Sequence, residues 1–384
     1  MAELLATSGI LDIYCYCKTI YITVRRVHWI LIYLYESSIN FTIEMLLSDI
    51  RHWAPFRLDA LGIVTLLGAT ELDLCIGRLV RNRLTEGLPV LAAYIVASNS
   101  IIKPIPGFVL HNISDGILAT DITGWFARWL LCQNSTFASS VVSITLNQRP
   151  ASKWDEFSAY IAGSLAIGPL LVLAILMGDW WGLVNGLSML ISVLVRRTVV
   201  GQNRAALDLA ASRGNDRSKE MIKTFWALPT GTAITILAPR GVILDCLLTT
   251  PRPPHPRLYN LMRALGWLGF GCHVVSLGMA SLVSQLLSLF LLLAATVLVV
   301  YAVGDEEAYI GSQLLLERKD SLEKDFRAAT YARLNLSESE EASMVAWNLF
   351  PHKSNEKWWD RYRDYQDKKE AGALLDWDTL LGIP

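Results

Sequence analysis

The sequence carries little charge for its length. Only 18% of its 384 residues are Asp, Glu, Lys or Arg, whereas soluble domains carry about 25%. Hydrophobic residues make up 53% of the chain, and the mean hydropathy is +0.36. The formal net charge is −1, so the composition offers no basic surface for nucleic acid. The low charged fraction and the high hydrophobic fraction are typical of a multi-pass membrane protein with a soluble part. We therefore expect the lipid bilayer to be a partner of this chain.

The sequence also lacks the motifs of metal, nucleotide and hydrolase sites. There is no Cys-x-x-Cys pair, no HExxH, no GxGxxG, no P-loop and no GxSxG. The cysteines are isolated, which favours reduced thiols over a disulfide framework or a zinc site; they are Cys15, Cys17, Cys75, Cys132, Cys246 and Cys272. The sequence therefore predicts no metal and no cofactor, and it yields no catalytic residue.

Two long uncharged runs dominate what is present. No charged residue occurs from Phe157 to Met177, and none from Trp180 to Val195, with only Gly178-Asp179 between them. A helix of about 20 residues crosses the roughly 30 Å hydrocarbon core of a bilayer. Tryptophans at the break and Arg196-Arg197 at the end suit the two membrane interfaces. We therefore predict a transmembrane hairpin.

The segment Ala264–Gly304 contains no Asp, Glu, Lys or Arg. As one straight helix it would be about 60 Å long, twice the hydrocarbon thickness, so we expect it to fold back near Ser281–Gln285. Small residues at four-residue spacing predict close helix packing here and in the first hairpin, either within the chain or in self-association. They are Gly182 and Gly186, and Ser276, Ala280, Ser284 and Ser288.

Three further apolar stretches extend the prediction to about seven spans, within a range of five to eight. The spans are 58–77, 88–110, 125–146, 157–177, 180–196, 264–283 and 285–303. Basic residues favour the cytosolic side, which places 78–87, 147–156, 196–263 and the C-terminal tail there. Segment 10–35 has two interpretations. It is either a poor signal anchor, which would be an eighth span, or an amphipathic segment on the membrane surface.

The expected fold class is therefore all-α, a polytopic membrane helix bundle with a soluble helical tail. Residues 1–56 form a poorly defined segment, 57–303 the transmembrane domain with a cytosolic loop at 197–263, and 304–384 an acidic tail. In the tail, Ser337 and Glu340 form a capping box that predicts a helix over 338–349. A second helix is expected over 357–370, and a docked terminal helix is favoured over a sorting peptide at 374–380.

Polar residues within apolar segments are the candidate functional residues, because charge inside a bilayer is costly and usually serves a site. They are Asp59, Glu71, Asp73, Arg240, Asp245 and His273. Arg240 and Asp245 are close enough in sequence to pair in a partly buried site. The alternatives are that the acids lie at headgroup level and that His273 bonds to a neighbouring helix. Asn112-Ile-Ser114 is a sequon in a predicted outer loop, so Asn112 is a candidate for glycosylation.

The chain resembles a group of multi-pass membrane proteins of filamentous ascomycete fungi whose activity is uncharacterised. The resemblance covers about Phe56 to Tyr365 and rests on GDWWGLVNGLSMLISVLVRR, ILAPRGVILDCLLTTPRPP and YARLNLSESEEASMVAWNLFPHKSNEKWW. It brings no activity with it. Two function classes follow. We favour a transport, channel or membrane-organising role without covalent chemistry. The alternative is a membrane-embedded enzyme of fungal secondary metabolism, such as a cofactor-free cyclase with a raised-pKa acid.

Overall fold

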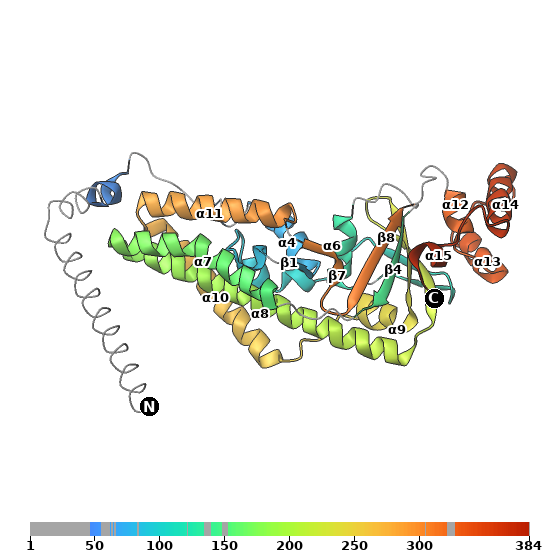
Figure 1. The fold of residues 1–384 in the computed structure, drawn as a ribbon, viewed down its shortest axis with the longest axis horizontal. Helices are drawn as coiled ribbons and strands as arrows, with labels where there is room; N and C mark the ends of the chain where they lie inside the picture. The colour runs from blue at the N-terminus through green and yellow to red at the C-terminus, as the bar shows by residue number, and fades with distance from the viewer. Residues whose placement is uncertain are drawn as a thin grey trace, which may run out of the picture.

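The computed structural model describes residues 47–54, 62, 64, 67–82, 84–120, 122–133, 140–147, 153–303, 305–320 and 327–383. These residues form an elongated molecule with long apolar helices at one end, a β-sheet in the middle and short helices at the other end (Figure 1). Segment 10–35 and Asp59 lie outside the described residues. The predictions that follow are therefore compared with the described residues from 47 onward.

Within the described residues, eight strands form one mixed sheet, in the order β1-β7-β8-β4-β6-β5-β2-β3. β4 and β6 pair in parallel and the other neighbours pair antiparallel. The strands are β1 Val80–Asn82, β2 Val109–Asn112, β3 Ile117–Ala119, β4 Ser140–Leu146, β5 Met221–Ala227, β6 Ala233–Pro239, β7 Asp305–Ile310 and β8 Leu314–Asp320.

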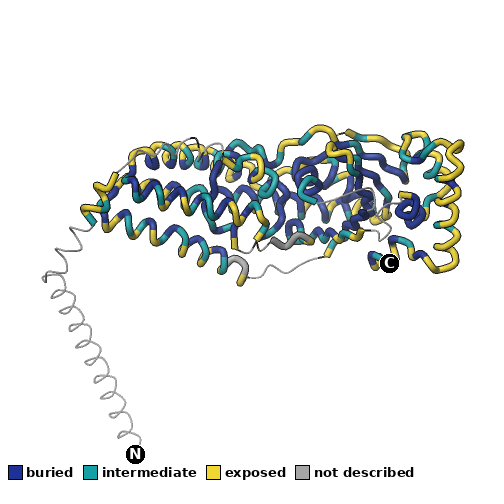
Figure 2. Tube along the Cα trace, turned by 90° about the horizontal axis from the view of Figure 1, so that it is seen from above, coloured by how far each residue is buried: buried dark blue, intermediate teal, exposed yellow. Residues whose placement is uncertain are grey.

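Both faces of the central strands are buried. In β6, Ile234 and Ile236 join one apolar core with the α8 side of the molecule, whereas Ala233 and Leu237 join a second core with the C-terminal helices. Figure 2 shows the sheet region as mostly buried chain. A strand covered on both faces has no polar alternation and reads as a continuous apolar run.

The helices range from single turns to 38 residues. The short ones are α4 Ala69–Gly77, η1 Thr85–Gly87, α5 Tyr94–Ala97, η2 Ser100–Ile102, α6 Gly124–Cys132, α9 Arg240–Val242 and the π-helix η3 Ile243–Leu248. The long ones are α7 Lys153–Leu176, α8 Trp180–Arg217, α10 Pro256–Met279 and α11 Leu282–Val300. The C-terminal ones are α12 Arg327–Ala332, α13 Glu338–Ala346, α14 Glu356–Glu370 and α15 Trp377–Leu381.

Four of the described helices, α7, α8, α10 and α11, are long and apolar enough to cross a membrane. They form two hairpins, and the second turns at Ala280-Ser281, so the predicted fold-back is confirmed. The predicted close packing is also found. A Cβ added at Gly182 would lie 2.8 Å from Ser284 Oγ of α11, and one at Gly186 would lie 2.5 Å from Leu171 Cδ2 of α7.

The prediction of an all-α fold with about seven spans is wrong. Residues 88–110 contain short turns and β2, and residues 125–146 contain α6 and β4. In 58–77 the structure has α4, which is only nine residues long. Described residues of each segment, such as Leu72, Leu91 and Val142, belong to the buried apolar core. Hydropathy alone does not separate strands buried on both faces from membrane segments.

Residues 197–263, expected as a cytosolic loop, are largely structured. α8 continues to Arg217, about 30 Å beyond Arg197 at 1.5 Å per residue, and β5 and β6 follow. β7 and β8, from the expected tail, complete the same sheet by pairing with β1 and β4. The sheet therefore draws on segments before, between and after the two helical hairpins.

Three of the C-terminal helices, α13, α14 and α15, lie where the sequence predicted helices, although α13 ends three residues earlier than expected, and α12 was not predicted. The capping box of Ser337 and Glu340 is present, and α13 and α14 begin within one residue of the positions expected. α15 docks through buried Trp377 and Leu381. These are local signals, set by capping and amphipathic spacing, which explains why the sequence was sufficient.

Candidate functional site

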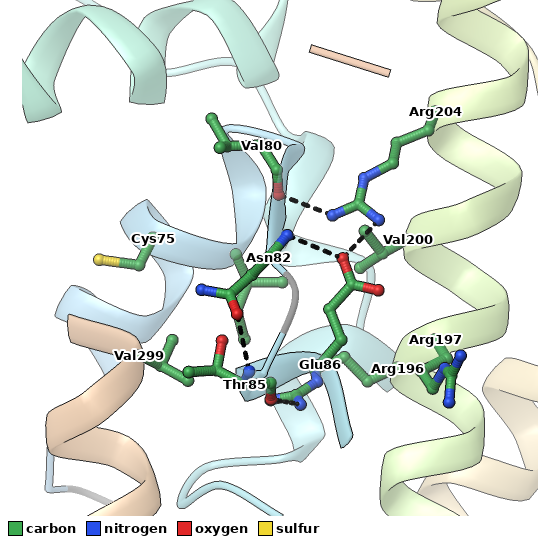
Figure 3. Close-up of a pocket in the computed structure, with 11 residues that line it drawn as sticks. Cys75, Val80, Asn82, Thr85, Glu86, Arg196, Arg197, Val200, Arg204 and Val299 are labelled. Atoms are coloured by element: carbon green, nitrogen blue, oxygen red, sulfur yellow. Dashed lines mark hydrogen bonds and ion pairs between the residues drawn. The ribbon is translucent and has the colours of Figure 1, made fainter. Parts of the chain in front are cut away.

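A cavity of about 50 Å³ lies where the apolar helices meet the sheet region. We call it the junction cavity. It is lined by residues of α4, β1, η1, α8 and the end of α11, and Figure 3 shows its side chains. Its lining residues are Cys75, Ile76, Val80, Asn82, Thr85, Glu86, Arg196, Arg197, Val200, Arg204 and Val299. Three arginines of one helix therefore share a small cavity with one glutamate.

Glu86 and Arg204 form the ion pair of the junction cavity. Arg204 Nη1 lies 2.7 Å from Glu86 Oε1, and Arg204 also donates to the carbonyls of Leu79 and Val80 at 3.0 and 2.6 Å. Burial acts to raise the pKa of Glu86, but the charge and hydrogen bond of Arg204, with the Asn82 N–H, outweigh it and hold the pKa below its ordinary value. The pair thus fixes η1 and β1 against α8 (Figure 3).

Arg196 and Asn82 bind the same loop to the two hairpins. Arg196 Nη2 donates to the carbonyls of Thr85 and Leu88 at 2.5 and 2.8 Å. Asn82 Oδ1 accepts from the N–H of Thr85 at 2.7 Å, and its Nδ2 donates to the Val303 carbonyl at 2.8 Å, just past α11. Backbone carbonyls therefore take up much of the donor capacity of Arg196 and Arg204.

Arg197 is differently placed. Its guanidinium lies over the ring of Tyr160 in α7, 4.1 Å from the centroid, and it is half-buried. Among the side chains that the structure describes, no carboxylate pairs with Arg197. The junction cavity therefore has one cation that is free to bind an anion, held in position by an aromatic face.

Asp73, predicted as a candidate, belongs to a structural ion pair. Its Oδ2 accepts from Nε and Nη2 of Arg128 at 2.9 and 2.6 Å, and its Oδ1 accepts from Ser100 Oγ at 2.7 Å. Arg128 is buried and also donates to the carbonyls of Ser100, Lys103 and Gly124. The pair therefore joins α4, η2 and α6, and both of its members are fully engaged.

Arg240 and Asp245 do not pair with each other. Arg240 pairs with Asp115 and Glu220 at 2.8 and 3.1 Å, and Asp245 pairs with Arg217 at 2.8 Å. Asp115 also accepts from the amide of Asn112 at 2.8 Å, so the structure brings Asn112 and Arg240 to one carboxylate. Asn112 is buried in β2. The structure does not test the glycosylation expected at Asn112, whose amide nitrogen donates to Asp115 in the folded sheet.

The remaining candidates are separate from the junction cavity. Glu71 is exposed in the first turn of α4. His273 is buried in α10, and its Nδ1 has no partner among the described residues. It lines a gap of about 10 Å³ with Met189, Ser192 and Leu292, which is room for about one water molecule. The structure does not bring the five described candidates into one site, and Asp59 lies outside the described residues.

Sequence reasoning missed Glu86, Asn82 and Arg204 as functional neighbours, and Arg128 as the partner of Asp73. Arg204 follows Arg196 by eight residues, just over two helical turns, so a long α8 would have placed both on one face. Because the sequence prediction places a loop after residue 197, the helical spacing of Arg196 and Arg204 is not apparent from it. The contacts of Asn82 with Val303 and of Glu86 with Arg204 had no sequence signal, because each joins positions more than 100 residues apart.

Among the described residues, no group of three or more His, Cys, Asp or Glu side chains could hold a metal ion. No family model, curated protein or solved structure matches the chain. Membership of the fungal group named above therefore stays an expectation from the sequence.

Proposed function

We propose that this chain is a multi-pass integral membrane protein with a membrane-organising role, in which two helical hairpins anchor the mixed sheet to one leaflet. The observation that carries the proposal is the outward face of the hairpins. In the most apolar window of each helix, between 28% and 44% of the residues are buried inside the protein. The outward side chains are large and apolar, such as Leu165, Leu187, Leu268 and Phe290. In water such a surface would be strongly unfavourable, whereas in lipid it is solvated.

The two hairpins enter from the same side. Both turn at the end away from the sheet, so the segments before α7, between α8 and α10 and after α11 all lie on the sheet side (Figure 1). Arg196 and Arg197 follow the uncharged run of α8, and Arg263 precedes the uncharged run of α10, so all three border the apolar parts of these helices on the sheet side. Because basic residues favour the cytosolic side, we infer that the sheet and the C-terminal tail are cytosolic. Asn112 lies in β2 of this sheet, so the same orientation would place it in the cytosol, where it would not be glycosylated.

A role without covalent chemistry fits the packed interior of the bundle. Asn185 of α8 donates to Ser288 Oγ of α11 at 2.8 Å, and Gly186 is packed directly against α7. The enzyme alternative required a protonated acid in an apolar pocket. Of the proposed acids, Asp73 and Asp245 are in ion pairs with arginines and Glu71 is exposed, so the described candidates give that alternative no support.

Alkaline carbonate extraction of membranes tests the proposal. The full-length chain should remain in the pellet, since four lipid-embedded helices are not released by removing peripheral contacts. A C-terminal epitope tag should resist protease in intact cells and be cleaved after permeabilisation. Release into the carbonate supernatant would refute the membrane anchor, and cleavage of the tag in intact cells would reverse the orientation.

A further inference from the structure

The junction cavity lies at the depth where the apolar helices end. Tyr160 of α7 and Tyr301 at the end of α11 are 63% and 77% exposed at this level, and Tyr160 is the ring beneath Arg197. Amphipathic aromatics of this kind favour the interface between hydrocarbon and headgroups. Counted from the first hairpin's turn, Arg197 lies about 27 Å along α8, close to the thickness of the hydrocarbon core. The cavity therefore lies at headgroup depth.

The charge at this depth is positive. The cavity is lined by Arg196, Arg197 and Arg204 against one carboxylate, Glu86, and that carboxylate is paired with Arg204. The whole segment from Cys246 to Val303 contains no Asp or Glu, while Arg263 lies at the base of α10. A low-dielectric wall on the bundle side increases the reach of these charges.

We propose that the junction cavity binds the phosphoryl group of an anionic phospholipid from the leaflet on the sheet side. The proposal rests on the membrane-anchored function above and names the lipid class that the same site recognises. Arg197 is the contact residue, because its guanidinium is held over Tyr160 and leaves its N–H groups to bind phosphate oxygens. Arg196 and Arg204 supply positive charge while their hydrogen bonds hold the backbone. Basic pockets between membrane helices on the cytosolic side are suited to such headgroups.

The lining of the cavity favours a lipid over a free anion. Val200 and Val299 form part of its wall, and next to Val299 the exposed outer face of α11 carries Val297 and Leu298. A phosphoryl group in the cavity would leave its acyl chains along this apolar surface. The volume of about 50 Å³ suits one phosphoryl group and is too small for a nucleotide.

Lipid binding to the purified full-length protein in detergent tests the proposal. Phosphatidylserine and phosphatidylcholine are added separately, and bound lipid is followed by native mass spectrometry and by the midpoint of thermal unfolding. Phosphatidylserine should be retained at lower concentration and should raise the midpoint more. Arg197→Gln should weaken the binding of phosphatidylserine about tenfold, the value of one charge-assisted hydrogen bond. It should weaken the binding of phosphatidylcholine less, because the choline cation offsets the charge of the phosphodiester that both lipids carry. Arg197→Lys should restore part of the preference.

Arg213→Gln is the matched control. Arg213 is an exposed arginine of the same helix, about 24 Å further from the membrane, so its loss should leave the lipid preference unchanged. Equal binding of the two lipids, or equal losses in the Arg197 and Arg213 variants, would overturn the proposal. If inorganic phosphate raised the unfolding midpoint as much as phosphatidylserine does, and this effect required Arg197, the ligand would be a free phosphate and the lipid proposal would be overturned. If the chain stays in the pellet after carbonate extraction but does not prefer the anionic lipid, only the lipid-binding proposal is refuted. Release of the chain by carbonate would refute the proposed membrane function itself.

Discussion

The carboxylate of Asp179 accepts two hydrogen bonds from Ser281, one from its backbone N–H at 2.9 Å and one from its hydroxyl at 2.7 Å. Asp179 lies in the turn between α7 and α8, and Ser281 lies in the turn between α10 and α11. The other carboxylate oxygen caps α8 through the N–H of Gly182. One buried side chain therefore joins the tips of the two hairpins.

Replacing Asp179 by alanine should separate the hairpin tips. The change removes a charged acceptor and leaves the donors of Ser281 and Gly182 without their partner, so we expect a loss of about 2–4 kcal/mol of stability. The thermal unfolding midpoint of the purified protein in detergent measures it. Asp216→Ala, at an exposed acid of α8, serves as the control and should change the midpoint little. Equal midpoints for both variants would show that Asp179 does not couple the hairpins.

The same residue predicts a pH dependence. Burial alone would raise the pKa of Asp179, but the hydrogen bonds from Gly182, Ser281 and Ser284 outweigh it and lower the pKa below its ordinary value. The stabilisation is therefore complete above the unfolded pKa of about 4 and is lost as the pH falls through the folded value. Unfolding midpoints measured from pH 7 to pH 3 should decline below pH 4 more steeply in the wild type than in Asp179→Asn. Parallel curves would contradict the assignment.

The Arg128–Asp73 pair should behave as a buried structural ion pair. Asp73→Ala should destabilise the protein by about 3–5 kcal/mol, because it leaves the buried guanidinium without its counter-charge. Adding Arg128→Met should recover part of that loss. A double-mutant cycle in chemical denaturant gives the coupling free energy. Additive losses from the two changes would show that the pair does not act as a unit.

Two glycines of α8 should respond in opposite ways to alanine. A Cβ at Gly214 would lie 2.5 Å from the Gly241 carbonyl oxygen, so Gly214→Ala must separate α8 from α9 and should cost about 1–3 kcal/mol. A Cβ at Gly201 would meet no atom within 4 Å, so Gly201→Ala should stabilise the helix by about 0.5–1 kcal/mol. Thermal unfolding of the two variants side by side decides the matter, and shifts of the same sign would contradict this packing.

Cys246 should be inert in the folded protein. Burial, with the nearby carboxylates of Asp245 and Asp208, raises the pKa of its thiol to about 12. Because the thiolate is the reactive form, alkylation at pH 8 should be at least about a hundredfold slower than for an unfolded thiol. Peptide mass spectrometry after iodoacetamide treatment, with and without denaturant, measures the ratio. Rapid labelling of Cys246 without denaturant would contradict its burial.

The sequence alone located the hairpins and the C-terminal helices. The uncharged runs on either side of Gly178-Asp179 marked α7 and the beginning of α8, which continues to Arg217, 21 residues past the predicted end. The Ser337 capping box marked the beginning of α13. In the junction cavity, the position of Arg196 could be predicted because it directly follows an apolar run. Its hydrogen-bond partners could not be predicted, because they are the backbone carbonyls of Thr85 and Leu88, which have no sequence signature. Arg197 likewise gave no sign that it would lie over Tyr160.

The sequence by itself determined where the four apolar helices and the turns of their two hairpins lie. A helix completes its backbone hydrogen bonds within one segment, so a long uncharged run with a polar break can locate one, although the same reasoning also selected 88–110 and 125–146, which contain short helices and strands. What only the tertiary structure decided is the sheet, in which β1 pairs with β7 more than 220 residues later and β4 lies between β6 and β8. Strand pairing satisfies backbone groups across the chain, and strands buried on both faces have the same apolar composition as membrane helices.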